Sequence, residues 1–327
     1  MRTPNRILVA VKNPRSRASS PAVKKAAQIA RACGAELQLF HAVTAPVFVD
    51  MLVFQNKSLA AFDKDQRVDA LRRLEVIAER LRSEGTRVST AVTIDFPAYE
   101  AIIRQASSAR SDLIVVEAHE GHKVPWLLRL TDWELLRHSA LPVLLVKNSR
   151  PYRHPVVLAA VDPTHAFAKS SRLDEDILSA ATVLGKALRG TLHAIHAFPP
   201  LPIGIRPAEF KSRGITADLS ELAEAAARKG FDAALKTASI PPVRRHLVGQ
   251  HPVDAIPQVA RTTRGSIVVM GAISRSGLKR LFIGNTAEQV LDQLQCDVLV
   301  VKHKGFKTGV RQARRGPQLL AMPALTT

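Results

Sequence analysis

The stretch MGAISRSGLKRLFIGNTAEQVLDQLQCDVLVVK, Met270 to Lys302, decides the fold. It begins at the end of an apolar run, passes through a loop with Gly and Ser, and finishes with an amphipathic segment and a second apolar run. The earlier stretch VVEAHEGHKVPWLLRLTDWELLRHSALPVLLVK, Val115 to Lys147, has the same order of segments but no glycine matching Gly284. The chain therefore contains one module twice, and such internal repetition has to be identified before any other feature of the fold.

Three further pairs of segments occur in the same order in both halves. NRILVAVKNP (5–14) matches HPVVLAAVDP (154–163), LQLFHAV (37–43) matches LHAIHAF (192–198), and DLIVVEA from Asp112 matches SIVVMGA from Ser266. A chain of 327 residues divides into two domains of ordinary size, each long enough to bury its own core. We expect these domains over 1–148 and 149–304, joined near 147–155 and followed by a tail over 305–327.

Short β-branched runs alternate with longer amphipathic stretches in each half. We expect strands at 7–11, 37–43, 88–94, 113–116 and 143–146, and helices at 21–33, 59–83, 98–107 and 132–138. The second half repeats the pattern, with helices near 173–188, 218–237, 254–264 and 286–294. Several runs are apolar without alternation, which is typical of parallel strands covered on both faces. The pattern predicts two tandem α/β domains, each a doubly wound parallel sheet that binds ligands beyond the carboxyl ends of its strands.

Composition and hydropathy indicate the cellular location of the protein. No apolar run approaches the roughly 20 residues that span a bilayer, and the amino-terminal run is too short for the apolar core of a signal peptide. We therefore expect a cytoplasmic protein without membrane insertion. Its two cysteines, Cys33 and Cys296, are expected to be buried, reduced thiols.

The chain carries a formal net charge of +19 and a pI near 10.7, which favours attraction to polyanions. The segment before Glu36 contains basic residues but no acidic ones, and no acidic residue follows Asp297. The tail after that point is punctuated by Gly and Pro, and we expect it to be disordered. Because no aromatic platform or known nucleic-acid fold accompanies this charge, we expect only weak, non-specific polyanion binding through the basic termini, with an affinity that falls steeply with salt.

The second half resembles the universal stress protein family. A strand ending at Asp162, a strand followed by His196-Ala197, and Gly271-x-x-Ser274-(nine residues)-Gly284-Asn285 are similar to the nucleotide-binding members, which show Gly-x-x-Gly, nine residues, then Gly-Ser or Gly-Thr. TDWELLR from Thr131 and GNTAEQVLDQLQCDVLVVK from Gly284, in one chain with two repeats, look like the tandem subtype. The resemblance covers residues 5–302 and implies a Rossmann-like fold of the adenine nucleotide alpha hydrolase type.

What the resemblance implies for the second domain is bound ATP, with Mg²⁺. Asp162 would lie near the adenine or ribose and Ala197 and Met270 would line the base, while the ribose and phosphates would be surrounded by Gly271, Ile273, Ser274, Gly284, Asn285 and Thr286. Glycine lets backbone N–H groups approach phosphate oxygens, and the start of the following helix adds partial positive charge.

Ser274 and Asn285 depart from the family pattern and keep other interpretations open. Asn285 is also a good residue to initiate a helix, with Glu288 three residues later completing a capping arrangement. The glycines also suit a tight loop without a ligand, and Asp162 suits a turn before Pro163.

The first half lacks the glycine pattern and the aspartate of the second half, so we expect no nucleotide there. Lys12 stands where the second half has Asp162, and Thr131 with Glu134 forms a predicted capping box. His119 and His122 are expected in a solvated loop rather than a metal site. His41 and His196, at matching strand ends, are expected to be structural. We assign no metal ligand and no catalytic residue.

These observations favour a non-enzymatic regulator of the stress response, acting through protein partners that the sequence does not identify. The two modules would pack as an internal pseudo-dimer, with a homodimer as a further alternative, and nucleotide in the second module would be an optional signal. One alternative is a slow ATP hydrolase, for which Asp162 is the obvious carboxylate. Another is a carrier of an acylated metabolite or lipid, because Ser274 relaxes the nucleotide pattern.

Overall fold

A computed structural model describes residues 1–14, 20–44, 47–49, 59–118, 131–163, 172–199, 215–272, 285–316 and 319–321. The chain divides into two compact units. The first domain is Pro4–Pro151 together with Lys307–Thr327, and the second domain is Tyr152–Phe306 together with Met1–Thr3. Each domain is therefore built mainly from one half of the sequence and completed by a terminal segment.

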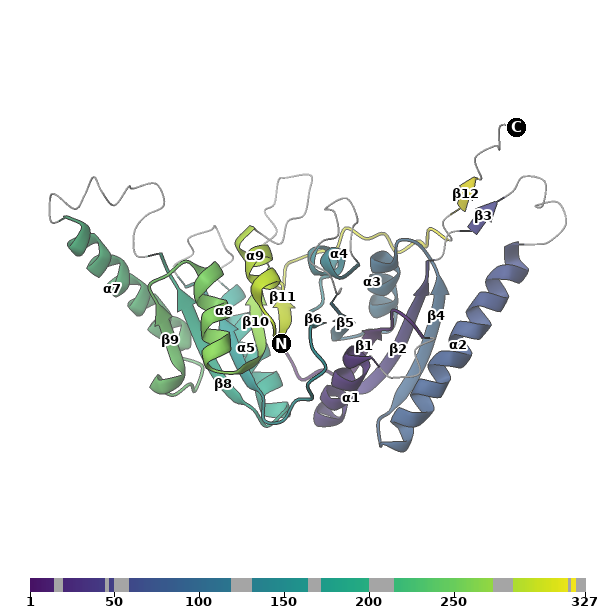
Figure 1. The fold of residues 1–327 in the computed structure, drawn as a ribbon, viewed down its shortest axis with the longest axis horizontal. Coiled ribbons are helices and arrows are strands. Elements are labelled where there is room, and N and C mark those ends of the chain that lie inside the picture. Colours follow the sequence, from purple (N-terminus) through teal and green to yellow (C-terminus); the bar gives the residue numbers. More distant parts are fainter. Residues whose placement is uncertain are drawn as a thin grey trace. The chain divides into compact units, whose positions relative to one another are not determined.

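The first domain contains a parallel sheet with the strand order β4-β2-β1-β5-β6 (Figure 1). Its strands are β1 (Arg6–Ala10), β2 (Glu36–Val43), β4 (Val88–Ile94), β5 (Leu113–Glu117) and β6 (Val143–Val146). Its helices are α1 (Pro21–Cys33), α2 (Leu59–Ser83), α3 (Ala98–Ser108) and α4 (Thr131–His138). All four residues of β6 are buried, as expected for a strand covered on both faces.

The second domain repeats this topology with the order β9-β8-β7-β10-β11, also parallel. Its strands are β7 (Val156–Ala160), β8 (Thr191–Ala197), β9 (Arg245–Val248), β10 (Gly265–Gly271) and β11 (Asp297–Val301). Its helices are α5 (Leu173–Ala187), α7 (Ile215–Leu235), α8 (Pro252–Thr262) and α9 (Asn285–Gln293), with a short 3₁₀ turn η2 (Pro242–Arg244). In both domains the first strand lies in the middle of the sheet, so the predicted doubly wound α/β fold is confirmed.

The first domain shows how local residues mark the ends of its helices. The Ser20 hydroxyl accepts a hydrogen bond from the Val23 N–H at 3.3 Å, and Pro21 occupies the first turn of α1. Gly34 ends α1 in the left-handed region at φ 66°. Gly85, two residues beyond α2, has φ 82°, a left-handed conformation typical of glycine just past the end of a helix.

The linker is anchored to the second domain by a buried polar pair. The Tyr152 hydroxyl donates to Asp297 Oδ2 at 2.5 Å, and the exposed fractions of these residues are 9% and 0%. Burial, reinforced by the Asp297 carboxylate, raises the pKa of Tyr152 well above its usual value. The phenol therefore remains protonated and keeps donating to the carboxylate.

The C-terminal segment differs from the disorder that we expected. Asp95 Oδ1 accepts hydrogen bonds from the backbone N–H groups of Arg315 and Gly316, at 2.9 and 3.2 Å. Farther along, β12 (Leu319–Ala321) pairs in parallel with β3 (Val47–Val49), beside which it lies in Figure 1. Composition alone misled here, because buried acidic groups of the first domain bind this basic segment.

Two other features concern the predicted environment of the chain. Cys33 and Cys296 are free thiols, as expected, but both are half-buried rather than buried. Partial burial still raises the pKa of the Cys33 thiol. Among the described residues, every helix is too short or too polar to cross a membrane.

We predict that Tyr152→Phe destabilises the second domain by about 1–3 kcal/mol, because the buried Asp297 carboxylate loses a hydrogen-bond donor. Urea denaturation followed by circular dichroism measures this loss. Tyr99→Phe is the matched control, since the Tyr99 hydroxyl is only partly buried and lies 3.2 Å from Glu100 Oε1. Equal losses of unfolding free energy in Tyr152→Phe and Tyr99→Phe would show that burial of the hydrogen bond does not set its contribution.

Candidate functional site

The candidate site lies at the carboxyl edge of the second-domain sheet. Ala160 at the end of β7 is paired with Ile195 on β8 and with Met270 on β10. Because the chain leaves β7 and β10 toward opposite faces, the strand order reverses between them, and this reversal is where doubly wound sheets bind ligands. The register brings Asp162, Ala197 and Gly271 to the same edge.

Asp162 is half-buried just beyond β7 and is connected to the start of α5. Its backbone N–H donates to Asp174 Oδ1 at 3.0 Å. Asp174 is only 5% exposed and lies in the first turn of α5, where the helix dipole stabilises a carboxylate. Sequence reasoning missed Asp174, since its partner is the backbone of a residue on another element. Two acidic side chains therefore stand at this part of the edge, which suits hydroxyl or amino groups of a ligand better than phosphates.

Ala197 is half-buried at the end of β8 and follows a fixed histidine. His196 Nδ1 donates to the carbonyl oxygen of Val161 at 3.2 Å, and its ring packs near Phe198 and Phe231. In the first domain, His41 Nδ1 makes the matching contact with the Val11 carbonyl at 2.7 Å. Burial lowers the pKa of His41. The repetition of this bond in both domains supports the structural role predicted for the two histidines.

Met270 is 6% exposed, and Gly271 ends β10. A Cβ atom on Gly271 would lie 2.7 Å from Leu173 Cδ2, 2.9 Å from Leu173 Cγ and 3.2 Å from Ile177 Cδ1. Both neighbours belong to α5. Gly271 is therefore required by the close packing of a helix on the sheet, a reason that the sequence did not reveal.

The phosphate side of the predicted site is only partly described. Ile273, Ser274 and Gly284 lie outside the described residues. Helix α9 begins at Asn285, as predicted, and Thr286 is half-buried in its first turn. Because α9 leads back to the start of β11, its N-terminus faces the carboxyl edge and adds partial positive charge there.

Lys302 is a second residue that sequence reasoning missed. It follows β11 directly. The residue before it, Val301, accepts a hydrogen bond from the Ala272 N–H just beyond β10, at 3.0 Å, so Lys302 lies at the same edge of the sheet. Its side chain is 7% exposed and its ammonium lies 4.2 Å from the centre of the Phe306 ring. Burial lowers the pKa of Lys302 to about 8. A buried basic group thus lies at the β11 side of the edge, and the acidic residues lie at the β7 side.

The first domain places different groups at its corresponding edge. Lys12, in the position of Asp162, is exposed. Lys25 of α1 is only 2% exposed and donates from Nζ to Asn148 Oδ1 at 3.0 Å. The predicted absence of nucleotide from this domain stays a prediction, and His119 and His122, which we expected in a solvated loop, lie outside the described residues.

The predicted capping box of α4 does not form. The helix includes Thr131, and Glu134 turns to the end of the same helix, with Arg137 Nη1 at 3.0 Å and His138 Nε2 at 3.2 Å. The hydrogen bond from His138, aided by Arg137, lowers the pKa of Glu134. Within the described ranges, no three His, Cys, Asp or Glu side chains come together as a metal site.

We predict that Gly271→Ala destabilises the chain by about 1–3 kcal/mol, because the added methyl group overlaps the Leu173 side chain. Chemical denaturation measures the change. Adding Leu173→Ala should make the double variant less destabilised than the sum of the two changes. Gly309→Ala is the control, since a Cβ there meets nothing within 4 Å. If the losses of unfolding free energy in Gly271→Ala and Leu173→Ala simply add, the contact with α5 does not explain why residue 271 is glycine.

Lys302 should make stability depend on alkaline pH. Its pKa is about 8 in the folded chain and about 10.4 when unfolded, so the unfolded chain binds more protons between these values. The cost of burying the charge is fully present below pH 8 and disappears toward pH 10.4. The unfolding free energy of the wild type relative to Lys302→Met should therefore rise by about 3 kcal/mol over this window. Lys304→Met, at a position 85% exposed, is the control, and a constant difference for Lys302→Met would refute the prediction.

Comparison with known proteins agrees with this architecture. The model of the universal stress protein family matches residues 4–147 and again 156–302. Universal stress protein E of Escherichia coli K12 and that of Salmonella typhi are each 31% identical over 219 residues, which is 65% of this chain and 67% of theirs. The resemblance to the tandem subtype is thereby confirmed.

Solved structures show the same organisation. A functionally unknown protein from Pseudomonas aeruginosa PAO1 is similar with a TM-score of 0.69 and 28% identity, over 92% of this chain and 93% of that protein. A universal stress protein from Archaeoglobus fulgidus shares the fold with a TM-score of 0.59 and 17% identity, over 90% and 96% of the two chains. With two matched domains and the topology described above, this chain belongs to the universal stress protein family, as a tandem member.

Proposed function

We propose that the second domain binds an adenine nucleotide, first of all ATP, and that the chain acts in the cytoplasm as a non-enzymatic regulator of the stress response. The observation that carries this proposal is the convergence of Asp162, Ala197, Met270 and Gly271 at the strand-order reversal of the sheet. Membership of the universal stress protein family supports it. Partner proteins would distinguish the nucleotide-bound form of this domain from the nucleotide-free form.

The division of charge at the edge supports an orientation for the nucleotide. The adenine and ribose would lie over β7 and β8, where Asp162 accepts hydrogen bonds from ribose hydroxyls or the adenine amino group, beside Ala197 and Met270. The phosphates would extend toward α9, with Gly271, Ile273, Ser274, Gly284, Asn285 and Thr286 around the ribose and phosphates. Lys302, close to the strand ends on that side, would favour their negative charge.

Mg²⁺ would accompany the triphosphate, held mainly by phosphate oxygens and water. The proposal assigns no catalytic residue. Asp174, the second carboxylate at this edge, already accepts the Asp162 N–H through Oδ1, which leaves it poorly suited to act as a base. Slow ATP hydrolysis is therefore the alternative activity that the experiment has to test.

Mass spectrometry of the small molecules released by denaturing the purified protein, with thermal-shift titration of ATP and Mg²⁺, tests the proposal. We expect a nucleotide in the released fraction. At 100 times the dissociation constant, ATP should stabilise the folded protein by about 2.7 kcal/mol, a rise of several degrees in Tm. If ATP at millimolar concentration leaves Tm unchanged and none is released, the proposal fails. An acylated metabolite or lipid in the released fraction would favour the carrier alternative.

The internal repeat supplies a matched control for the site. Asp162→Ala should weaken ATP binding roughly tenfold or more through the loss of hydrogen bonds to the nucleotide, whereas Lys12→Ala, at the equivalent position of the first domain, should leave it unchanged. Gly284→Val should block approach of the phosphates. Unchanged affinity in Gly284→Val would show that the assigned loop is wrong, and release of phosphate from bound ATP would favour the hydrolase.

A further inference from the structure

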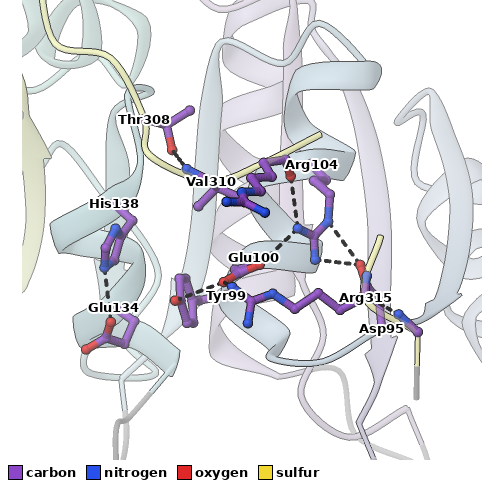
Figure 2. A network of polar contacts seen from close by, with 11 residues as sticks. Asp95, Tyr99, Glu100, Arg104, Glu134, His138, Thr308, Val310 and Arg315 are labelled. Carbon is purple, nitrogen blue, oxygen red and sulfur yellow. Dashed lines mark hydrogen bonds and ion pairs between the residues drawn. The ribbon is translucent and has the colours of Figure 1, made fainter. Parts of the chain in front are cut away.

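The C-terminal segment is bound to the first domain through its backbone (Figure 2). Asp95 Oδ1 accepts the N–H groups of Arg315 and Gly316, and the Phe96 N–H donates to the Gly316 carbonyl at 3.0 Å. Arg104 Nη1 donates to the Arg311 carbonyl at 3.0 Å. These contacts capture a peptide backbone at two points, as peptide-recognition sites do.

The receiving residues are buried and form a fixed cluster. The exposed fractions of Asp95, Glu100 and Arg104 are 1%, 4% and 6%. Arg104 donates to Asp95 Oδ2 from Nε at 3.0 Å and from Nη2 at 2.8 Å, and to Glu100 Oε2 from Nη1 at 3.0 Å. Since Arg104 is itself held by two carboxylates, the cluster is a preformed surface rather than a chance contact of mobile side chains.

The charges of this cluster do not balance without the C-terminal segment. Asp95 and Glu100 contribute two negative charges, and Arg104 contributes one positive charge. The second positive charge comes from Arg315, whose Nη2 lies 2.6 Å from Glu100 Oε1, while Arg104 is shared between Glu100 and Asp95. A carboxylate that a bound peptide covers without a compensating charge is costly, so a ligand of this cluster should carry a cation.

The bound segment also has a defined backbone shape. Gly316 has φ 80°, a left-handed conformation that side chains disfavour. Beyond it, β12 continues in parallel pairing with β3. The site therefore selects an arginine followed by a residue in the left-handed region and then an extended segment.

We propose that Asp95, Glu100 and Arg104 form a peptide-binding site for arginine-glycine segments, and that Arg315-Gly316 of the same chain is its resident ligand. Because the segment is covalently attached, it occupies the site at an effective concentration in the millimolar range. When the resident segment is displaced, the site takes the same motif from another chain, including a second copy of this protein. The carboxylates exclude nucleic acid and other polyanions from the cluster itself.

The test uses the full chain and a fluorescent peptide with the sequence KTGVRQARRGPQ, residues 307–318. The wild type should bind the peptide weakly, because its own segment competes. Arg315→Ala should disengage the segment and raise the affinity for the added peptide at least tenfold. Arg314→Ala removes the same charge from the neighbouring exposed residue and should bind as weakly as the wild type.

Hydrogen exchange makes the test decisive if affinities are low. The amides of Arg315 and Gly316 should be protected in the wild type and in Arg314→Ala, and should lose protection in Arg315→Ala. If Arg315→Ala loses protection yet binds the peptide no better than the wild type, the proposal is wrong. Equal binding of a peptide with Val in place of Gly316 would overturn the requirement for a left-handed residue. Loss of protection on adding polyphosphate to the wild type would show that the segment serves a polyanion instead.

Discussion

Both domains depend on burying a central parallel strand on both of its faces. β1 and β7 each pair with neighbours on both sides, and helices cover the sheet above and below, so the strand can be apolar along almost its whole length. Parallel pairing requires a crossover after every strand, and all strand ends therefore meet at one edge. The position of the first strand in the middle of the sheet fixes where the strand order reverses along that edge. Charge at the edge then differs between the domains, with Asp162 and Asp174 in one and Lys12 and Lys25 in the other.

Most of this frame follows from local sequence. The helix predicted near 173–188 is α5 over Leu173–Ala187, and the helix predicted near 286–294 is α9 over Asn285–Gln293. Apolar periodicity and capping residues act within a few positions of one another, which is why they can be detected in one chain. The repeat predicts that the two domains share one topology, and the strand order is the same in both. The family resemblance predicts that Asp162, Ala197 and Gly271 are neighbours, and their common position agrees with the rule that the ends of parallel strands meet at one edge.

The parts that could not be predicted depend on contacts between distant residues. Gly271 is constrained by Leu173, almost a hundred positions earlier, and no local pattern records that contact. Lys302 ends a run of apolar residues like many exposed lysines, and only the folded chain shows that its ammonium is covered. The C-terminal segment has the composition of a disordered tail, because its binding partners are the buried carboxylates of Asp95 and Glu100 more than 200 positions away.

The exchange of terminal segments has a consequence for how the duplicated gene can evolve. The Met1 ammonium donates to Ser179 Oγ at 2.7 Å, so the first residues of the chain complete the second domain, while the last residues complete the first. Neither domain is a continuous stretch of sequence. A break in the gene between residues 151 and 152 would leave each product without a piece that its own half does not encode. Reversal of the fusion would therefore cost each module some of its contacts, which favours keeping the two halves in one chain.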